Sequence, residues 1–128
     1  MHKFFAKSAI LLCATSVVLG AFAAHVLKKY LSDQAINVFE TAVRYQFYHA
    51  LALLILALLF DRFNSIWAIR ACRCFISGMI LFCGSLYALS LLMPDYSYLG
   101  MITPFGGVFF IIGWIAMFVS VLKTDTEK

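Results

Sequence analysis

The chain has 128 residues, of which 64% are hydrophobic and only 12% carry a charge. Soluble domains contain about half apolar and about a quarter charged residues, so this composition excludes an ordinary water-soluble domain and indicates an integral membrane protein. The net charge is +4, but the Lys and Arg residues lie at the ends of apolar runs. This distribution is typical of membrane topology, and we do not expect nucleic-acid binding.

The first predicted span covers about residues 5–27 and contains the uncharged run Ser8–Leu27. Twenty helical residues extend about 30 Å, which is the thickness of the hydrocarbon core. A cleaved signal peptide is the alternative, because Ala21-Phe-Ala resembles a cleavage site after a basic start. Small residues at every fourth position favour a retained span, since they predict close helix packing. These residues are Ser16, Gly20 and Ala24.

An amphipathic helix is predicted over about residues 33–48, leading into a second span over about 45–60. Ser32 or Asp33 is suited to cap its start. Apolar residues recur at helical spacing on one side of this helix, and polar residues occupy the other side. The uncharged part of the second span is short, so we expect the amphipathic part to lie in the membrane interface. The polar stripe consists of Asp33, Asn37, Glu40, Thr41, Arg44 and Tyr48.

Two further spans are predicted over about residues 74–93 and 104–122, which makes the fold an all-α, single-domain four-helix membrane bundle. Pro94 ends the third span, because the residue before a proline avoids helical geometry. Thr103 is the expected cap of the fourth span, with Pro104 in its first turn. The polar tail at 123–128 is expected to be disordered. Close helix packing is expected at three glycines. These are Gly84, Gly106 and Gly113.

Four spans place both termini on the same side of the membrane. Seven Lys and Arg residues lie on that side, and three lie on the other side, namely Lys28, Lys29 and Arg44. The positive-inside rule then predicts that both termini are cytoplasmic. Cys72 and Cys74 would face a reducing compartment as thiols. This C-x-C pair lacks the additional ligands of a zinc site, so no metal is expected.

Ionisable and hydroxyl-bearing residues of three spans collect near the opposite membrane face. Burial of ionisable groups in a membrane is costly, so this cluster is a hypothesis for ligand or partner binding. The alternative is a structural role, because Glu40 and Arg44 have the spacing of a helical ion pair. His49 lies about half a turn from Glu40 and must face another helix, in the first or the fourth span. The candidate site residues are His25, Glu40, Arg44, Tyr48, His49 and Thr103.

No helix carries two histidines at metal-ligand spacing, and no glycine-rich phosphate loop is present. We therefore expect no catalytic residue and no cofactor, although an enzyme assembled from scattered residues stays open. The leading hypothesis is a non-enzymatic membrane protein that binds a lipid, a small hydrophobic ligand or a partner membrane protein, a second copy included. The alternative is a small oligomeric transporter or channel, which would need polar groups across the membrane midplane.

Three stretches of the chain carry a resemblance to a known family. They read LGAFAAH at 19–25, VFETAVRYQFYH at 38–49 and ITPFGG at 102–107. These stretches resemble the YgdD/YwdK-like family of small multi-pass membrane proteins, which carry a domain of unknown function. Ala23 departs from the family, whose members often have glycine there. The resemblance implies four helices in the bacterial inner membrane and an uncleaved first helix, and it names no substrate.

Overall fold

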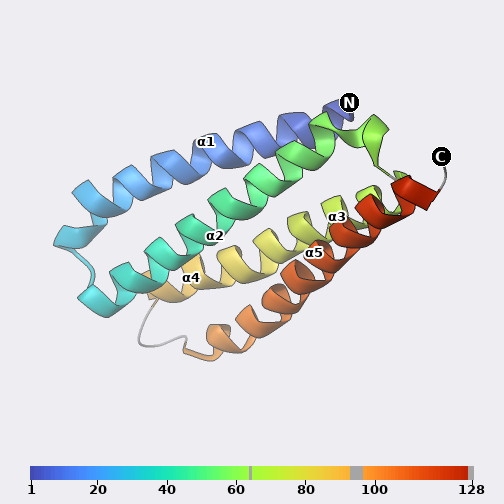
Figure 1. Ribbon diagram of the computed structural model, residues 1–128. Coiled ribbons are helices and arrows are strands. Elements are labelled where there is room, and N and C mark those ends of the chain that lie inside the picture. Colours follow the sequence, from blue (N-terminus) through green and yellow to red (C-terminus); the bar gives the residue numbers. More distant parts are fainter. Residues whose placement is uncertain (64, 93–96, 127–128) are drawn as a thin grey trace.

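The computed structural model describes residues 1–63, 65–92 and 97–126, and these residues form helices joined by short connections (Figure 1). The first two long helices are α1 (Lys3–His25) and α2 (Asp33–Leu58). The third long segment, the α3–α4 rod, consists of two α-helices joined by a π-helical turn, and the last helix, α5, follows it. The rod comprises α3 (Ser65–Gly78), the π-helical turn η3 (Met79–Cys83) and α4 (Gly84–Leu92). Helix α5 spans Thr103–Thr126. Short 3-10 turns are η1 (Leu27–Lys29), η2 (Phe60–Arg62) and η4 (Ser97–Met101).

Within the described residues, four helical segments are long and apolar enough to cross a membrane, which confirms the predicted all-α, four-span fold. They are Lys3–Lys29, Asp33–Leu58, Ser65–Leu92 and Thr103–Lys123. Large apolar side chains cover the outside of the bundle, and Val18 and Phe105 are each about two-thirds exposed. Lipid is the solvent that tolerates such a surface without an energetic cost.

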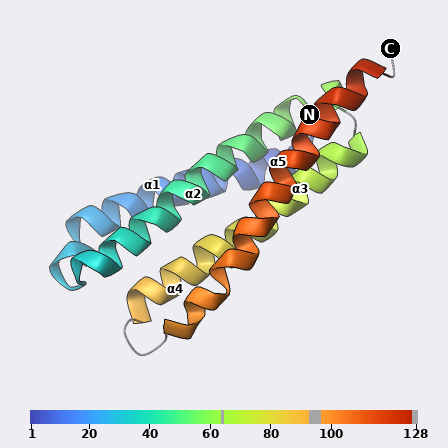
Figure 2. The ribbon, with the colours of Figure 1, turned by 60° about the horizontal axis from the view of Figure 1, so that its bottom comes forward.

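The helices form two antiparallel pairs, α1 with α2 and the α3–α4 rod with α5 (Figures 1 and 2). The pairs join where α2 packs against η3 and α4. The chain termini lie at the same end of the molecule in both views. The turn between α1 and α2 lies at the opposite end, together with the start of α5.

The predicted amphipathic helix and the second span are one continuous helix, α2. Ser32 caps it, because the Ser32 hydroxyl accepts a hydrogen bond from the Ala35 backbone N–H at 3.2 Å. Ser16 Oγ of α1 donates to the Val43 carbonyl of α2 at 3.1 Å, and this contact sets their antiparallel register. Arg44 therefore lies beside the middle of α1, about 13 Å along the helix axis from the end of α1 at His25.

The α3–α4 rod packs closely on α5 through glycines. A Cβ atom added at Gly106 would lie 2.3 Å from the Phe82 backbone nitrogen, and one added at Gly113 would lie 2.7 Å from the Phe75 ring. Gly78 is equally crowded, since a Cβ there would lie 2.5 Å from the Phe110 ring. These three positions let the two helices approach each other more closely than side chains would permit.

Several details differ from the expectations drawn from the sequence. Helix α3 begins at Ser65, well before residue 74, and the predicted stop at Pro94 lies outside the described residues. The first turn of α5 is closed by the Ile102 carbonyl, which accepts from Gly106 N–H at 3.4 Å, so Thr103 is not its cap. Helix α5 also continues to Thr126, so the expected disorder of the tail is wrong as far as that residue.

The small residues expected at helix contacts have different surroundings. Ser16 is buried against α2, and a Cβ at Gly20 would lie 3.4 Å from the Val43 side chain. Ala24 is exposed, and a Cβ at Gly84 would meet nothing within 4 Å. The packing roles expected of Ala24 and Gly84 are therefore wrong for contacts among the described residues. The row of small residues on α1 turns away from α2 near the end of the helix.

Candidate functional site

Two polar residues lie on the buried face of α2, where apolar residues are the rule. This face runs through Phe39, Ala42, Gln46, His49 and Leu53 at helical spacing. Gln46 and His49 are only 6% exposed. Because an unsatisfied polar group is costly in a membrane interior, each of these side chains needs hydrogen-bond partners on neighbouring helices.

Gln46 finds its partners on α1 and α4. The Gln46 amide nitrogen donates to the Leu12 carbonyl at 2.9 Å and to Thr15 Oγ1 at 3.0 Å. The Gln46 carbonyl oxygen accepts from the Tyr87 hydroxyl at 2.9 Å. One amide therefore ties three helices together. Gln46 was not among the predicted site residues, although a glutamine on the Phe39 face of α2 is a pattern that could have indicated this role.

His49 is held between α2 and α5 by both of its ring nitrogens. Nδ1 lies 2.7 Å from the Tyr45 carbonyl, which can only accept a hydrogen bond. The Trp114 indole N–H donates to Nε2 at 3.2 Å, and an indole N–H can only donate. The imidazole is therefore neutral, with its proton on Nδ1. Of the two neighbours left open by the sequence, the structure places His49 against the fourth span.

An aromatic cluster surrounds this imidazole and joins α2 to α5. The His49 ring stacks on Phe110 with centroids 3.5 Å apart and planes 10° from parallel. Tyr45 stacks on Phe82 of the π-helical turn at 4.7 Å. Such ring pairs contribute about 0.5–1.5 kcal/mol beyond their buried area. Trp114, Phe110 and Phe82 were not expected at the site, because their positions depend on how the helices cross.

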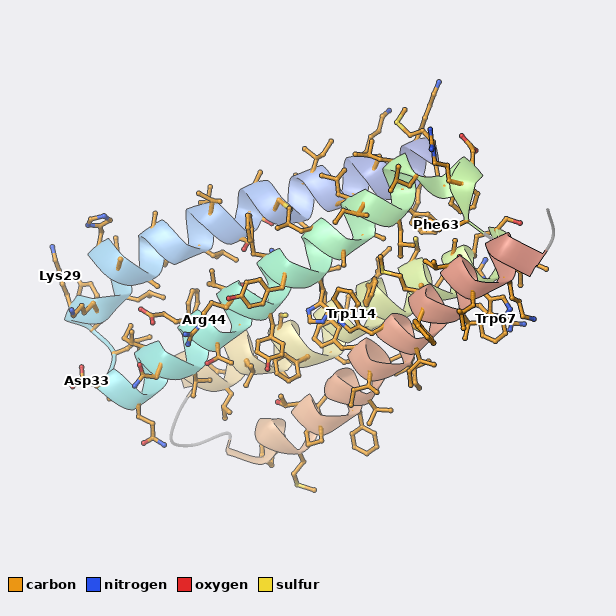
Figure 3. The ribbon with its side chains drawn as sticks, viewed as in Figure 1. Lys29, Asp33, Arg44, Phe63, Trp67 and Trp114 are labelled. Atoms are coloured by element: carbon orange, nitrogen blue, oxygen red, sulfur yellow. The ribbon has the colours of Figure 1, made fainter. Side chains whose placement is uncertain are left out.

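The exposed candidates on α2 are arranged differently from the expectation. Among the described residues, Glu40 and Arg44 form no ion pair with each other, and both side chains are exposed. The ion pair suggested by their spacing is therefore absent. Figure 3 shows Arg44 well inside the length of the bundle, away from Lys29 and Asp33 at one end and from Phe63 and Trp67 at the other.

The remaining candidates do not join one cluster. His25 is exposed at the end of α1. The Thr103 hydroxyl lies 2.8 Å from Ser85 Oγ of α4, which links the start of α5 to the neighbouring helix. The structure thus places Tyr48 and His49 beside α5, and it places Arg44 and Tyr48 beside α1. His25 and Thr103 belong to neither of these two groups.

Two grooves open beside the candidate residues of α2. The α2–α5 groove has a volume of about 700 Å³, and its walls are almost entirely apolar or aromatic. Tyr48, Ile111 and Trp114 lie at its open side and are about half exposed, so it faces the surrounding lipid. The α1–α2 groove has a volume of about 470 Å³ and is lined by Gly20, Ala21, Arg44 and Tyr48, among others. Tyr48 lines both grooves.

A third groove lies on the other side of α2, between α1 and the α3–α4 rod, with a volume of about 420 Å³. Ser8, Gln46 and Tyr87 supply its polar side chains, and Gln46 and Tyr87 hydrogen bond to each other. The rest of the lining is largely apolar and includes Leu12, Met79 and Ile80. This groove has no charged side chain among its lining residues, so it differs from the groove beside Arg44.

Residues 19–107 match the family described as "Protein of unknown function (DUF423)". The chain is 43% identical over 109 residues to the UPF0382 membrane protein YwdK of Bacillus subtilis, covering 84% of this chain and 87% of YwdK. It is 40% identical over 107 residues to the UPF0382 inner membrane protein YgdD of Escherichia coli K12, covering 84% of this chain and 80% of YgdD.

A UPF0382 membrane protein of Staphylococcus epidermidis is 43% identical over 104 residues, covering 81% of this chain and 83% of the relative. No solved structure matches the chain. The matched region runs from the end of α1 to the first turn of α5 and includes the α2 residues described above. The chain therefore belongs to the DUF423 family, whose YgdD and YwdK members it had resembled in sequence, and it is a multi-pass membrane protein.

Proposed function

We propose that this chain is a non-enzymatic protein of the bacterial inner membrane that binds lipid in the lateral grooves beside the middle of α2. The observation that carries the proposal is the α2–α5 groove. Its volume of about 700 Å³ is in the range of small-molecule sites, and its apolar walls match a hydrocarbon chain. Because the groove faces the bilayer, a lipid can enter it sideways without crossing water.

The chemistry of the groove favours binding over catalysis. His49 is the residue most suited to proton transfer, but both of its nitrogens are engaged with Tyr45 and Trp114. The phenols of Tyr45 and Tyr48 offer hydrogen-bond donors at the groove, and both side chains are exposed. A lipid with acceptor oxygens and an apolar chain has the matching pattern.

A groove-filling variant tests the proposal. A Cβ atom at Gly107 would lie 3.9 Å from the Phe82 ring, so Gly107→Leu extends into the α2–α5 groove without a backbone clash. Ala14→Leu is the control, because Ala14 is exposed on α1 outside the three grooves described above. Native mass spectrometry in mild detergent should show lipid on the wild type and on the control, with occupancy reduced several-fold on Gly107→Leu.

Two results would contradict lipid binding in this groove. In the first, the wild type carries no lipid under conditions in which it stays folded. In the second, Gly107→Leu binds as much lipid as Ala14→Leu. Helical circular dichroism and a single elution peak check that each variant is folded. A co-purifying protein in place of lipid would move the assignment to a partner membrane protein and would equally overturn the proposal.

A further inference from the structure

The α1–α2 groove combines unpaired charge with an apolar channel. The Arg44 guanidinium and the Glu40 carboxylate both lie on the same stripe of α2, one helical turn apart. Neither forms an ion pair with a side chain in the described part of the chain. Charges beside a membrane span are costly unless a counter-charge is available, so both groups are suited to a ligand that carries the opposite charges.

Arg44 lies close to the level of the first turn of α5, and its long side chain extends toward the headgroup side. His49 stacks on Phe110, which lies seven residues, or about 10 Å, after the start of α5 at Thr103. Arg44 precedes His49 by five residues, or about 7.5 Å, so it lies close to the level at which α5 begins. Glu40 lies one turn further out. Because side chains on a helix point toward its N-terminus, the Arg44 guanidinium reaches from inside the bundle toward the headgroup side, where Glu40 lies.

The groove below Arg44 has room for an acyl chain. Gly20 and Ala21 of α1 leave space open on the Glu40 side of Arg44, and Val17 of α1 with Phe47 of α2 lines the groove on the other side. The Tyr48 side chain is 57% exposed, and it extends the groove toward the membrane interior, one turn below Arg44. The Ser16 hydroxyl is engaged with the Val43 carbonyl, so it is not available to a ligand. The order along α2 is thus carboxylate, guanidinium, phenol and apolar channel.

We propose that the α1–α2 groove binds a zwitterionic glycerophospholipid that carries a primary amine. Its phosphate pairs with Arg44, its ammonium group with Glu40, and one acyl chain lies along Val17 and Tyr48. Guanidinium groups bind phosphate through paired hydrogen bonds. A lipid with phosphate but no amine satisfies Arg44 alone and leaves Glu40 beside a second negative charge. This inference rests on the proposed lipid-binding function and specifies its ligand class.

Native mass spectrometry of the full chain with defined lipids tests the inference. The protein is exchanged into detergent containing equal amounts of dioleoyl phosphatidylethanolamine and dioleoyl phosphatidylglycerol. The wild type should bind the ethanolamine lipid in preference to the glycerol lipid. Glu40→Gln should remove or reverse this preference, because the carboxylate no longer attracts an amine. Arg44→Gln should weaken binding of both lipids roughly tenfold, the loss expected for a hydrogen bond to a charged group.

Matched charge variants outside the groove provide the control. Lys29→Gln and Asp33→Asn each remove one charge of the same sign near the same end of the molecule, and both should bind as the wild type does. If Arg44→Gln fails to fold, Arg44→Lys keeps the charge but loses the paired geometry, and it should still weaken phosphate binding. Unchanged lipid preference in Glu40→Gln and unchanged affinity in the Arg44 variant would overturn the inference.

The outcomes separate this inference from the general function. If Gly107→Leu loses lipid while the Glu40 and Arg44 variants keep the wild-type headgroup preference, the proposed lipid-binding function stands and the α1–α2 headgroup site is rejected. If the wild type binds neither lipid, both the lipid-binding function and the α1–α2 headgroup site are rejected. A preference for the glycerol lipid in the wild type would show that Arg44 acts without Glu40, and it would reject the amine-bearing class.

Discussion

A single amide, that of Gln46, links α1, α2 and α4 in the interior of the bundle. In a membrane the hydrophobic effect does not drive helices together, so interhelical hydrogen bonds and close packing contribute a larger share of the stability of the bundle. Interhelical hydrogen bonds in membranes contribute about 0.6 kcal/mol on average and about 1.7 kcal/mol at most. Gln46 makes three of them, and two of these attach α1 to α2.

Replacement of this amide by an apolar group should loosen the bundle. Gln46→Leu removes the partners of Thr15 and Tyr87, and we expect a loss of about 1–2 kcal/mol in the free energy of unfolding. Denaturing-detergent titration followed by circular dichroism measures this change. Gln34→Leu is the control, because Gln34 is exposed near the start of α2. Equal stability of the two variants would show that the amide network has no energetic role.

The protonation state of His49 follows directly from its two partners. Nδ1 donates to a carbonyl and Nε2 accepts from an indole, so the neutral Nδ1–H form satisfies both nitrogens. Nitrogen-15 NMR of selectively labelled protein should show this tautomer, and Trp114→Phe should shift the Nε2 resonance by removing its donor. A resonance typical of the Nε2–H tautomer would contradict the assigned geometry.

The candidate residues illustrate what a sequence can and cannot reveal about a site. The cost of charge in a membrane pointed to Arg44 and to His49, and the helical spacing correctly separated His49 from Glu40. The partner of His49 could not be read, since Trp114 is 65 residues away and reaches it only through the crossing of α2 and α5. The spacing of Glu40 and Arg44 allowed an ion pair as the alternative to a binding role, but spacing alone does not fix the positions of two exposed side chains.

At the scale of the elements, the α3–α5 contact depends on glycines that face aromatic rings. The π-helical turn η3 places Phe82 directly against Gly106, and Gly78 and Gly113 receive Phe110 and Phe75. The spacing of Gly106 and Gly113 indicated a close contact in advance. The π-helical turn was not foreseen, because no proline or other breaker interrupts residues 79–83 and the turn arises from packing.

Alanine substitution should separate a crowded glycine from an open one. Gly106→Ala introduces a Cβ 2.3 Å from the Phe82 backbone nitrogen, so α5 must shift, and we expect a loss of about 1–3 kcal/mol. Gly84→Ala meets nothing within 4 Å and should be neutral or stabilising by up to about 1 kcal/mol, the helix-propensity gain. Unfolding in detergent measures both, and similar effects at the two positions would contradict the packing.

At the scale of the whole molecule, the number of spans and the helical class followed from composition and from the lengths of the uncharged runs. The joining of the amphipathic segment and the second span into one helix was also foreseeable, since no breaker separates them. The pairing of α1 with α2 and of the α3–α4 rod with α5 depends on side-chain packing, and it creates the grooves. A sequence pattern does not contain that information.

The structure places the two termini at the same end, and the distribution of Lys and Arg predicts that this end is cytoplasmic (Figure 1). A reporter that is active only in the cytoplasm should therefore function when fused after the last residue. The same reporter inserted between Lys29 and Asp33 should be inactive, because that turn lies at the opposite end. Activity of the second fusion alone would reverse the proposed orientation.

Photo-crosslinking in growing cells tests lipid binding at α2 most directly. A benzophenone side chain replaces Tyr48, which lines both grooves, and in a control protein it replaces Ile115, which is 56% exposed on α5 outside them. Mass spectrometry then identifies the attached lipids. We predict that position 48 captures an amine-bearing phospholipid above its share of the membrane, whereas position 115 reflects the bulk composition. The same bulk composition at both positions would contradict a lipid site on α2.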